Sequence, residues 1–216
     1  MATEAAAAAG SEAAMASSVT QQPTDLERRE LARRQLQPDD CALVVVDIQE
    51  KLLPPIHETE RLVRNSALLL RLAAILKIPV LATTQYAKGL GGIVPEIATL
   101  LPAGTAPLDK LEFGCFANDG FCAAVKALPG RRNTLLVCGM ESHICVTQTV
   151  LGALRQGYLV HVATDAVGSR AAWNWQIGLE RMKTAGAMMS SSEMIIYELL
   201  RASGTAEFKE MLKHLK

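Results

Sequence analysis

The chain has 216 residues, of which 50% are hydrophobic and 20% are charged, a composition typical of a globular protein. Its 22 basic and 22 acidic residues give a formal net charge of zero, so no basic excess indicates nucleic acid or an anionic membrane as a partner. No apolar run approaches the roughly 20 residues of a membrane-spanning helix. These numbers favour one domain that is large enough to bury a continuous core.

The chain contains five cysteines, with no Cys-x-x-Cys pair: Cys41, Cys115, Cys122, Cys138 and Cys145. Because the number is odd and no secretory signal is visible, we expect reduced thiols and a cytoplasmic protein. No cysteine and histidine lie at a useful metal-ligand spacing, so the sequence predicts no zinc site.

Residues 1–38 are predicted to form an N-terminal arm that is disordered or partly helical. Residues 1–24 are rich in Ala, Ser, Thr and Gln, which is typical of disorder. An organelle-targeting segment is the alternative, although such segments are normally rich in Arg and poor in acidic residues. Residues 25–37 have helical spacing of Leu and charges, and Pro38 ends that helix.

The predicted domain spans residues 39–216, where strand-like and helix-like segments alternate. Strands are predicted at 41–46, 80–84, 133–138, 158–163 and 187–189, and a further short strand is predicted to end near Lys110. Helices are predicted at 60–77, 95–101, 118–128, 142–156, 173–185, 190–202 and 208–215. The strands are too apolar to face water, so this alternation predicts an α/β fold with three layers, a parallel sheet between two layers of helices.

Three side chains with catalytic chemistry follow predicted strands and are therefore expected at one edge of the sheet. Asp47 ends the first strand, Lys110 lies at a strand-to-loop boundary, and Cys145 lies near the start of a helix after Gly139. From the pattern alone, Asp47 is equally compatible with a turn cap, and a lysine is usually a solvated surface charge. At a helix start, unpaired N–H groups and the helix dipole favour a thiolate at Cys145.

Four motifs occur in a fixed order: Val-Val-Val-Asp47-Ile-Gln49, Lys110-x-x-Phe113, Gly139-Met-Glu-Ser-x-x-Cys145 and Asp165-Ala-x-x-Ser169-Arg170. Together they resemble the isochorismatase-like cysteine hydrolase family over about residues 42–193. The segment 84–96 is most similar to the subgroup of isochorismatase domain-containing proteins. The resemblance implies a Rossmann-like, six-stranded parallel sheet with the strand order 3-2-1-4-5-6.

The resemblance also implies a catalytic triad of Asp47, Lys110 and Cys145. It implies a cis peptide bond between Met140 and Glu141, and an oxyanion hole formed by the backbone N–H groups of Glu141 and Cys145. Lys110 and the helix N-terminus are expected to lower the pKa of Cys145. Residues expected to line the substrate pocket are Gln49, Gln85, Tyr86, Phe113 and Met140, although a lone tyrosine is equally compatible with packing.

The implied function is hydrolysis of an amide or related C–N bond of a small molecule through a thioester acyl-enzyme. Nicotinamidases of the family carry a metal-binding Asp-x-His and a second His before the triad lysine. Here only His57 lies between Asp47 and Lys110, so we predict no catalytic metal and no cofactor, and we expect no nicotinamidase activity. A cysteine at position 145 argues against cleavage of isochorismate, which does not depend on this residue.

Two other functions are compatible with the residues. One is a catalytically weak family member that serves as an oligomeric or partner-binding scaffold, with Trp173 and Trp175 in a subunit contact or over the substrate entrance. The other is a thiol redox protein, for which the sequence shows no obvious resolving cysteine: Cys115 and Cys138 could approach in space, but no pattern requires it. The partners predicted are a small-molecule substrate and further copies of the chain in a homo-oligomer, with neither nucleic acid nor a membrane.

Overall fold

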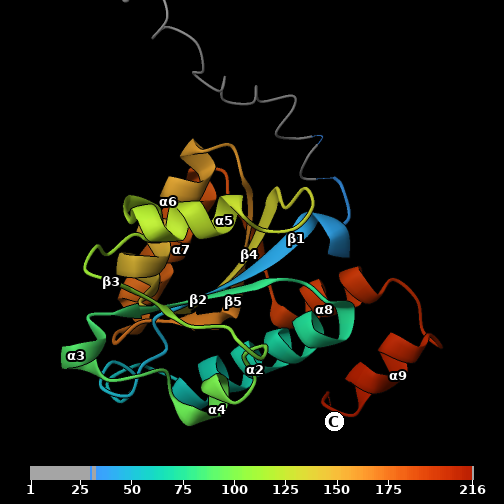
Figure 1. The fold of residues 1–216 in the computed structure, drawn as a ribbon, viewed down its shortest axis with the longest axis horizontal. Helices are drawn as coiled ribbons and strands as arrows, with labels where there is room; N and C mark the ends of the chain where they lie inside the picture. Colours follow the sequence, from blue (N-terminus) through green and yellow to red (C-terminus); the bar gives the residue numbers. More distant parts are fainter. Residues whose placement is uncertain (1–29, 31–32, 216) are drawn as a thin grey trace, which may run out of the picture.

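The computed structural model describes residue 30 and residues 33–215, and its centre is a parallel sheet of six strands (Figure 1). The strands are β1 Cys41–Val46, β2 Val80–Gln85, β3 Leu108–Lys110, β4 Thr134–Met140, β5 Leu159–Gly168 and β6 Met188–Ser190. Their order in the sheet is β3-β2-β1-β4-β5-β6. The predicted α/β fold and strand order are therefore confirmed.

Helices cover both faces of the sheet, with α2, α8 and α9 on one side and α5, α6 and α7 on the other (Figure 1). The α-helices are α2 Thr59–Leu76, α3 Ala87–Leu90, α4 Pro95–Ala98, α5 Asp119–Lys126, α6 Thr147–Arg155, α7 Ala172–Thr184, α8 Ser192–Leu200 and α9 Ala206–Leu212. In the part of the chain that the structure describes, the helical turns that are not α-helical are η1 Pro38–Asp40, η2 Cys115–Ala117 and η3 Ser142–Val146. Among the described residues, no helix has the length and hydropathy needed to cross a bilayer.

The alternation of side chains along β1 divides the core into two apolar clusters. Leu43 and Val45 pack in the cluster that contains residues of α2 and α8, whereas Val44 and Val46 pack in the cluster that contains residues of α6 and α7. All six residues of β1 are buried, because this central strand is covered on both faces. This arrangement explains the uninterrupted apolar run in the sequence, and it places the residue that follows the strand at a dry sheet edge.

Strand β5 is longer than predicted, because it continues through polar residues that the sequence assigns to a loop. The strand ends at Gly168, and its register with β4 shifts between Val137 and Gly139. The side chain of Asp165 is stabilised by the start of α8: its Oδ1 accepts hydrogen bonds from the backbone N–H and the hydroxyl of Ser192. A long-range partner therefore allows a polar segment to remain in the sheet.

The predicted arm lies largely outside the described residues, including all of residues 1–24 and most of the predicted helix at 25–37. Pro38 begins η1, a single turn that leads directly into β1. The division of the chain at residue 39 stays a prediction.

Candidate active site

Asp47 and Lys110 form a buried ion pair at the carboxyl edge of the sheet. Asp47 directly follows β1 and Lys110 is the last residue of β3. The Lys110 Nζ atom donates to Asp47 Oδ2 at 2.7 Å, and the two side chains are 1% and 0% exposed. The interpretations of Asp47 as a turn cap and of Lys110 as a solvated charge are therefore wrong. The pair is protected from water. In such a dry environment, two charges need further hydrogen bonds in addition to their mutual attraction.

Strand β2 lies between β1 and β3 and supplies those additional hydrogen bonds. The Thr83 hydroxyl donates to Asp47 Oδ1 at 2.7 Å, and Gln85 Oε1 accepts from Lys110 Nζ at 3.0 Å. Thr83 and Gln85 are two residues apart, so they project from the same face of the strand. Each member of the ion pair therefore has one partner on β2.

The amide groups of Gln49 and Gln85 are engaged by the protein itself. Gln49 Oε1 accepts from the Gln85 N–H at 2.7 Å, and Gln49 Nε2 donates to the carbonyl of Gly91 at 2.7 Å. Gln85 Nε2 donates to the carbonyl of Leu111 at 2.8 Å. These two glutamines hold the loop and the lysine in place, and their contact with a substrate stays a prediction.

Cys145 lies in η3, a π-helical turn that precedes α6 in place of the single helix predicted at 142–156. Its side chain packs in the core cluster on the α6 side and is 7% exposed. The charges of both Asp47 and Lys110 act on its thiol, as does the neighbouring Cys115. The structure thus brings the three predicted catalytic residues to one place.

The pKa of Cys145 is raised to about 12, which contradicts the predicted lowering. Burial is the largest cause, followed by the negative charge of Asp47, which disfavours the thiolate. Lys110 acts in the opposite direction, but its charge is already paired with Asp47. The resting site therefore contains a neutral thiol beside an ion pair.

The segment before η3 is fixed by an ion pair between Glu141 and Arg170. The peptide bond between Met140 and Glu141 is cis, at the position that the resemblance implies. Arg170 donates to the Glu141 carboxylate from its backbone N–H and from its guanidinium group, at 2.7 Å for Nη2. Burial alone raises the pKa of Glu141, but the hydrogen bonds from Arg170 outweigh it and leave that pKa below its ordinary value.

Two further residues of this region have contacts within the protein. His143 Nδ1 lies 3.0 Å from the Ser169 hydroxyl, which accounts for that serine of the fourth motif. Met140 is fully buried in the core cluster on the α2 side. Of the predicted pocket residues, Tyr86 and Phe113 are the two that reach the surface.

Sequence reasoning missed Thr83 and Cys115, which both approach Asp47. Cys115 is fully buried, and its Sγ lies 3.9 Å from Thr83 Oγ1. It packs on the α6 side of the sheet, whereas Cys138 packs on the α2 side, so the sheet separates these two cysteines. The only sequence signal for Cys115 is its position five residues after Lys110.

His57 lies beside the start of α2 near Glu58, and its side chain is exposed. Within the described part of the chain, no three His, Cys, Asp or Glu side chains converge on one point.

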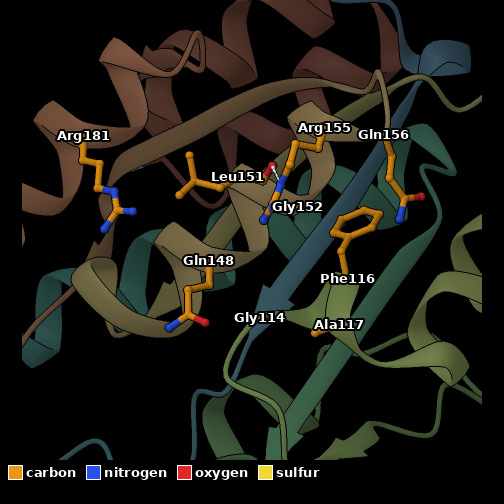
Figure 2. Close-up of a pocket in the computed structure, with 9 residues that line it drawn as sticks. All are labelled: Gly114, Phe116, Ala117, Gln148, Leu151, Gly152, Arg155, Gln156 and Arg181. Atoms are coloured by element: carbon orange, nitrogen blue, oxygen red, sulfur yellow. Dashed lines mark hydrogen bonds between the residues drawn. The ribbon is translucent and has the colours of Figure 1, made fainter. Parts of the chain in front are cut away.

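A separate groove of about 580 Å³ lies on the outer side of α6 (Figure 2). Its walls come from the segment before α5, from α6 and the residue after it, and from α7: Gly114, Phe116, Ala117, Gln148, Leu151, Gly152, Arg155, Gln156 and Arg181. The ring of Phe116 faces Gly152, where an added Cβ would approach the Phe116 Cβ to 2.6 Å. The segment that carries Cys115 is thus pressed against α6, with the groove on its outer face and the ion pair on its inner face.

The isochorismatase domain matches residues 41–194 of the chain. Isochorismatase domain-containing protein 2A of Mus musculus is 35% identical over 181 residues, which is 83% of this chain and 84% of that protein. The secreted isochorismatase effector Isc1 of Phytophthora sojae is 35% identical over 183 residues, covering 83% of this chain and 86% of the effector.

Solved structures show the same architecture. The MAR1 ribonuclease of Caenorhabditis elegans has a TM-score of 0.78 at 34% identity, covering 84% of this chain and 92% of that one. YcaC of Pseudomonas aeruginosa, solved with hexane-2,5-diol and covalent acrylamide, has a TM-score of 0.78 at 27% identity and the same coverage, 84% and 92%. YcaC of Escherichia coli, described as an octameric hydrolase of unknown specificity, has a TM-score of 0.77 at 27% identity, covering 83% and 90%. By domain, sequence and fold, this chain belongs to the isochorismatase family.

Proposed function

We propose that this protein is a cysteine hydrolase that cleaves an amide or related C–N bond of a small molecule. The observation that supports it is the neutral thiol of Cys145 beside the buried ion pair of Asp47 and Lys110. A carboxylate near enough for its charge to act on the thiol is well placed to accept the thiol proton when a substrate carbonyl arrives.

The proposed reaction has two halves. As the Cys145 sulfur attacks the carbonyl carbon, its proton passes to Asp47, and the oxyanion is bound by the backbone N–H groups of Glu141 and Cys145. Collapse of this adduct breaks the C–N bond, and Asp47 returns the proton to the leaving amine. Water then attacks the thioester with Asp47 as the base, which releases the acid and restores the thiol.

Lys110 has an electrostatic role in this scheme. Its ammonium group lies 2.7 Å from the Asp47 carboxylate and compensates that negative charge in a buried site, where an isolated carboxylate would be costly. The thiolate therefore forms by proton transfer during the attack, whereas the sequence suggested that it exists before the substrate binds. The reason is that the resting pKa of Cys145 is too high for appreciable ionisation at neutral pH.

A small, uncharged substrate fits this site better than a nucleic acid. One structural relative is called a ribonuclease, but this chain has a formal net charge of zero. Binding to a phosphate backbone depends on an excess of Lys and Arg. The exposed apolar side chains of Tyr86, Leu111 and Phe113, which flank the residues that hold Lys110, suit an apolar substituent on the substrate.

Hydrolysis of a panel of small amides, ureas and carbamates tests this proposal. We expect turnover by the wild type, and a loss of about 10³-fold or more in Cys145→Ala at unchanged circular dichroism. Cys122→Ala is the matched control, because Cys122 is partly exposed and has no role in the proposed reaction. Mass spectrometry should trap an acyl group on Cys145. Turnover that survives in Cys145→Ala would disprove the triad.

Acrylamide is a second probe, since a relative has been solved with covalent acrylamide. We propose that it adds to Cys145 of this chain. Its small size suits a thiol that is 7% exposed, and it carries no charge that would oppose entry. A bulky charged disulfide reagent should instead modify Cys122, the cysteine with the greatest exposure.

We also propose that the chain forms a homo-oligomer through the α6–α7 face, defined by Leu151, Trp173, Ile177, Glu180 and Arg181. Trp173 is 69% exposed and lies one helical turn before the exposed Ile177. The groove of Figure 2 and a second hollow beside Ile177 share Leu151 and Arg181, so the surface is continuous. Adjacent opposite charges at Glu180 and Arg181 allow two copies to complement each other.

Light scattering after gel filtration tests this contact. A monomer has a mass of 23.2 kDa, and we expect a multiple of that mass, in line with the octameric relative. Ile177→Asp should shift the population toward monomer, whereas Met194→Asp, at an exposed apolar position on α8, should not. A monomeric wild type would refute the proposed contact. An oligomer without turnover on any substrate would favour the scaffold function.

For location, we propose the cytoplasm, because all five cysteines are free. Since one relative is named a secreted effector, fractionation of cells that express the full chain is the appropriate measurement. Recovery in an organelle would indicate that residues 1–38 act as a targeting segment.

A further inference from the structure

The carboxylate of Asp47 is held from two sides, and the proposed reaction uses only one of them. Lys110 Nζ donates a hydrogen bond to Oδ2 and the Thr83 hydroxyl donates one to Oδ1, both at 2.7 Å. Thr83 is fully buried, and it has neither the charge nor the nucleophilic character of a triad member. A carboxylate that had only the lysine as partner could rotate about its terminal torsion, which has a broad energy profile.

The direction of the Thr83 hydrogen bond follows from its neighbours. An ionised carboxylate only accepts hydrogen bonds, so the Thr83 hydrogen points to Asp47. The oxygen of Thr83 then faces the Cys115 sulfur, which lies 3.9 Å away. Burial raises the pKa of Cys115 to about 11, so this sulfur carries a hydrogen that it can donate.

Cys115 is itself held in position. Its backbone N–H donates to the Thr149 hydroxyl of α6 at 3.0 Å. The result is a buried chain of donors that runs from Cys115 through Thr83 to Asp47, on the side of the carboxylate opposite Lys110. All of its members lie out of contact with solvent.

We infer that Thr83 is a positioning residue for the reaction. By fixing the rotation of the Asp47 carboxylate, its hydroxyl keeps one oxygen directed at Cys145, ready to accept the thiol proton. This inference rests on the proposed function, because it concerns how the base of that reaction is oriented. It adds a residue that touches neither the substrate nor the nucleophile.

Strand β2 offers a matched control at the next position. Thr84 projects from the opposite face and donates to Asp109 Oδ1 at 2.9 Å, away from the ion pair. Thr83→Val and Thr84→Val each replace a buried hydroxyl by a methyl group of the same shape. Both lose one hydrogen bond to a carboxylate, but only the first loses a bond to Asp47. Thr83→Ser retains the hydroxyl.

The readout is the rate of acrylamide addition to Cys145, because no substrate is required. The sulfur forms a bond to the terminal carbon as the carbon–carbon π bond breaks. The thiol proton passes to Asp47 and then to the carbon beside the carbonyl, so no oxidant or reductant takes part. Intact mass and peptide mapping identify the cysteine modified, and thermal unfolding of each variant reports its stability.

We expect Thr83→Val to slow the addition by about 10- to 100-fold, because a hydrogen bond to a charged group is lost. Thr83→Ser should restore the rate, and Thr84→Val should leave it near the wild-type value. An unchanged or faster rate in Thr83→Val overturns this inference alone. A loss that serine fails to restore, or that Thr84→Val shares, also overturns it, since packing would then explain the effect. Absence of any Cys145 adduct in the wild type overturns the proposed function as well.

Discussion

Lys110 and Asp47 are joined across β2, the strand that separates their own strands β3 and β1. The ion pair therefore links two strands that share no backbone hydrogen bonds. It lies at the edge where parallel α/β sheets bind their ligands. Its burial and its partners lead to a first prediction about stability.

Lys110→Met should destabilise the protein by about 3–5 kcal/mol, because it leaves the Asp47 charge buried without its counter-ion. Urea unfolding followed by circular dichroism measures this loss. Lys213→Met is the control, since Lys213 pairs with Glu210 on the surface of α9 and its side chain is exposed. That variant should unfold at the wild-type midpoint. Equal midpoints for both variants would contradict the stabilising role of the buried pair.

Arg170→Met should destabilise the protein at neutral pH and have less effect in acid. Arg170 holds the pKa of Glu141 below its ordinary value of 4.5, so the pair stabilises the fold above that pH. This stabilisation is lost as the pH falls through the lowered pKa and the carboxylate takes up a proton. Urea midpoints at pH 7 and pH 3.5 give the comparison.

Arg131→Met serves as the control for Arg170, because Arg131 is exposed and forms no ion pair among the described residues. Its effect on the midpoint should be the same at both pH values. A constant effect of Arg170→Met across this range would show that the ion pair with Glu141 does not contribute.

His161→Asn should reduce the loss of stability between pH 7 and pH 5. Burial lowers the pKa of His161 below 6.5, so on acidification the unfolded chain binds a proton before the folded protein does. The stability of the wild type is therefore greatest above pH 6.5 and falls as the pH drops below it. The asparagine amide can replace Nδ1, which lies 3.2 Å from the Ser190 hydroxyl.

The measurement is the thermal unfolding temperature as a function of pH. His57→Asn is the control, because the side chain of His57 is exposed. If the two variants have the same pH profile as the wild type, the buried histidine is not the source of the acid sensitivity.

Gly139→Ala should prevent folding or destabilise the protein by at least about 3 kcal/mol. Gly139 has a φ of +121°, and an added Cβ would lie 2.0 Å from the carbonyl oxygen of Val46. The backbone of β4 thus approaches β1 directly before Asp47, and no side chain fits between them. Gly92→Ala is the control, since an added Cβ there meets no atom within 4 Å. Soluble yield and urea unfolding distinguish the two.

The positions of the three candidate catalytic residues were predictable from the sequence. Buried strands 41–46 and 133–138 are long apolar runs, and parallel strands end at a common edge, so Asp47 and Cys145 had to lie near each other. Lys110 was harder to place, because β3 has only three residues, Leu108–Lys110. The resemblance to the family, more than the local pattern, assigned that lysine.

The extent of β5 was not predictable from local sequence. Residues 164–168 are too polar to indicate a strand on their own. They remain in the sheet because Asp165 caps α8, about 27 residues further along the chain. The π-helical turn Ser142–Val146 was likewise hidden, since its residues have the spacing of an ordinary helix.

The sequence by itself determined the layers, the strand order implied by the resemblance, and which residues stand at the sheet edge. Local patterns of burial and strand ends decide these properties. The tertiary structure alone decided the surroundings of the Cys145 thiol and the contacts of Thr83, Gln85 and Cys115. Charge and hydrogen bonding depend on neighbours distant in sequence, and on whether water reaches them. For this reason a cysteine expected as a thiolate is a neutral thiol, held beside a carboxylate that Lys110 and Thr83 fix from opposite sides.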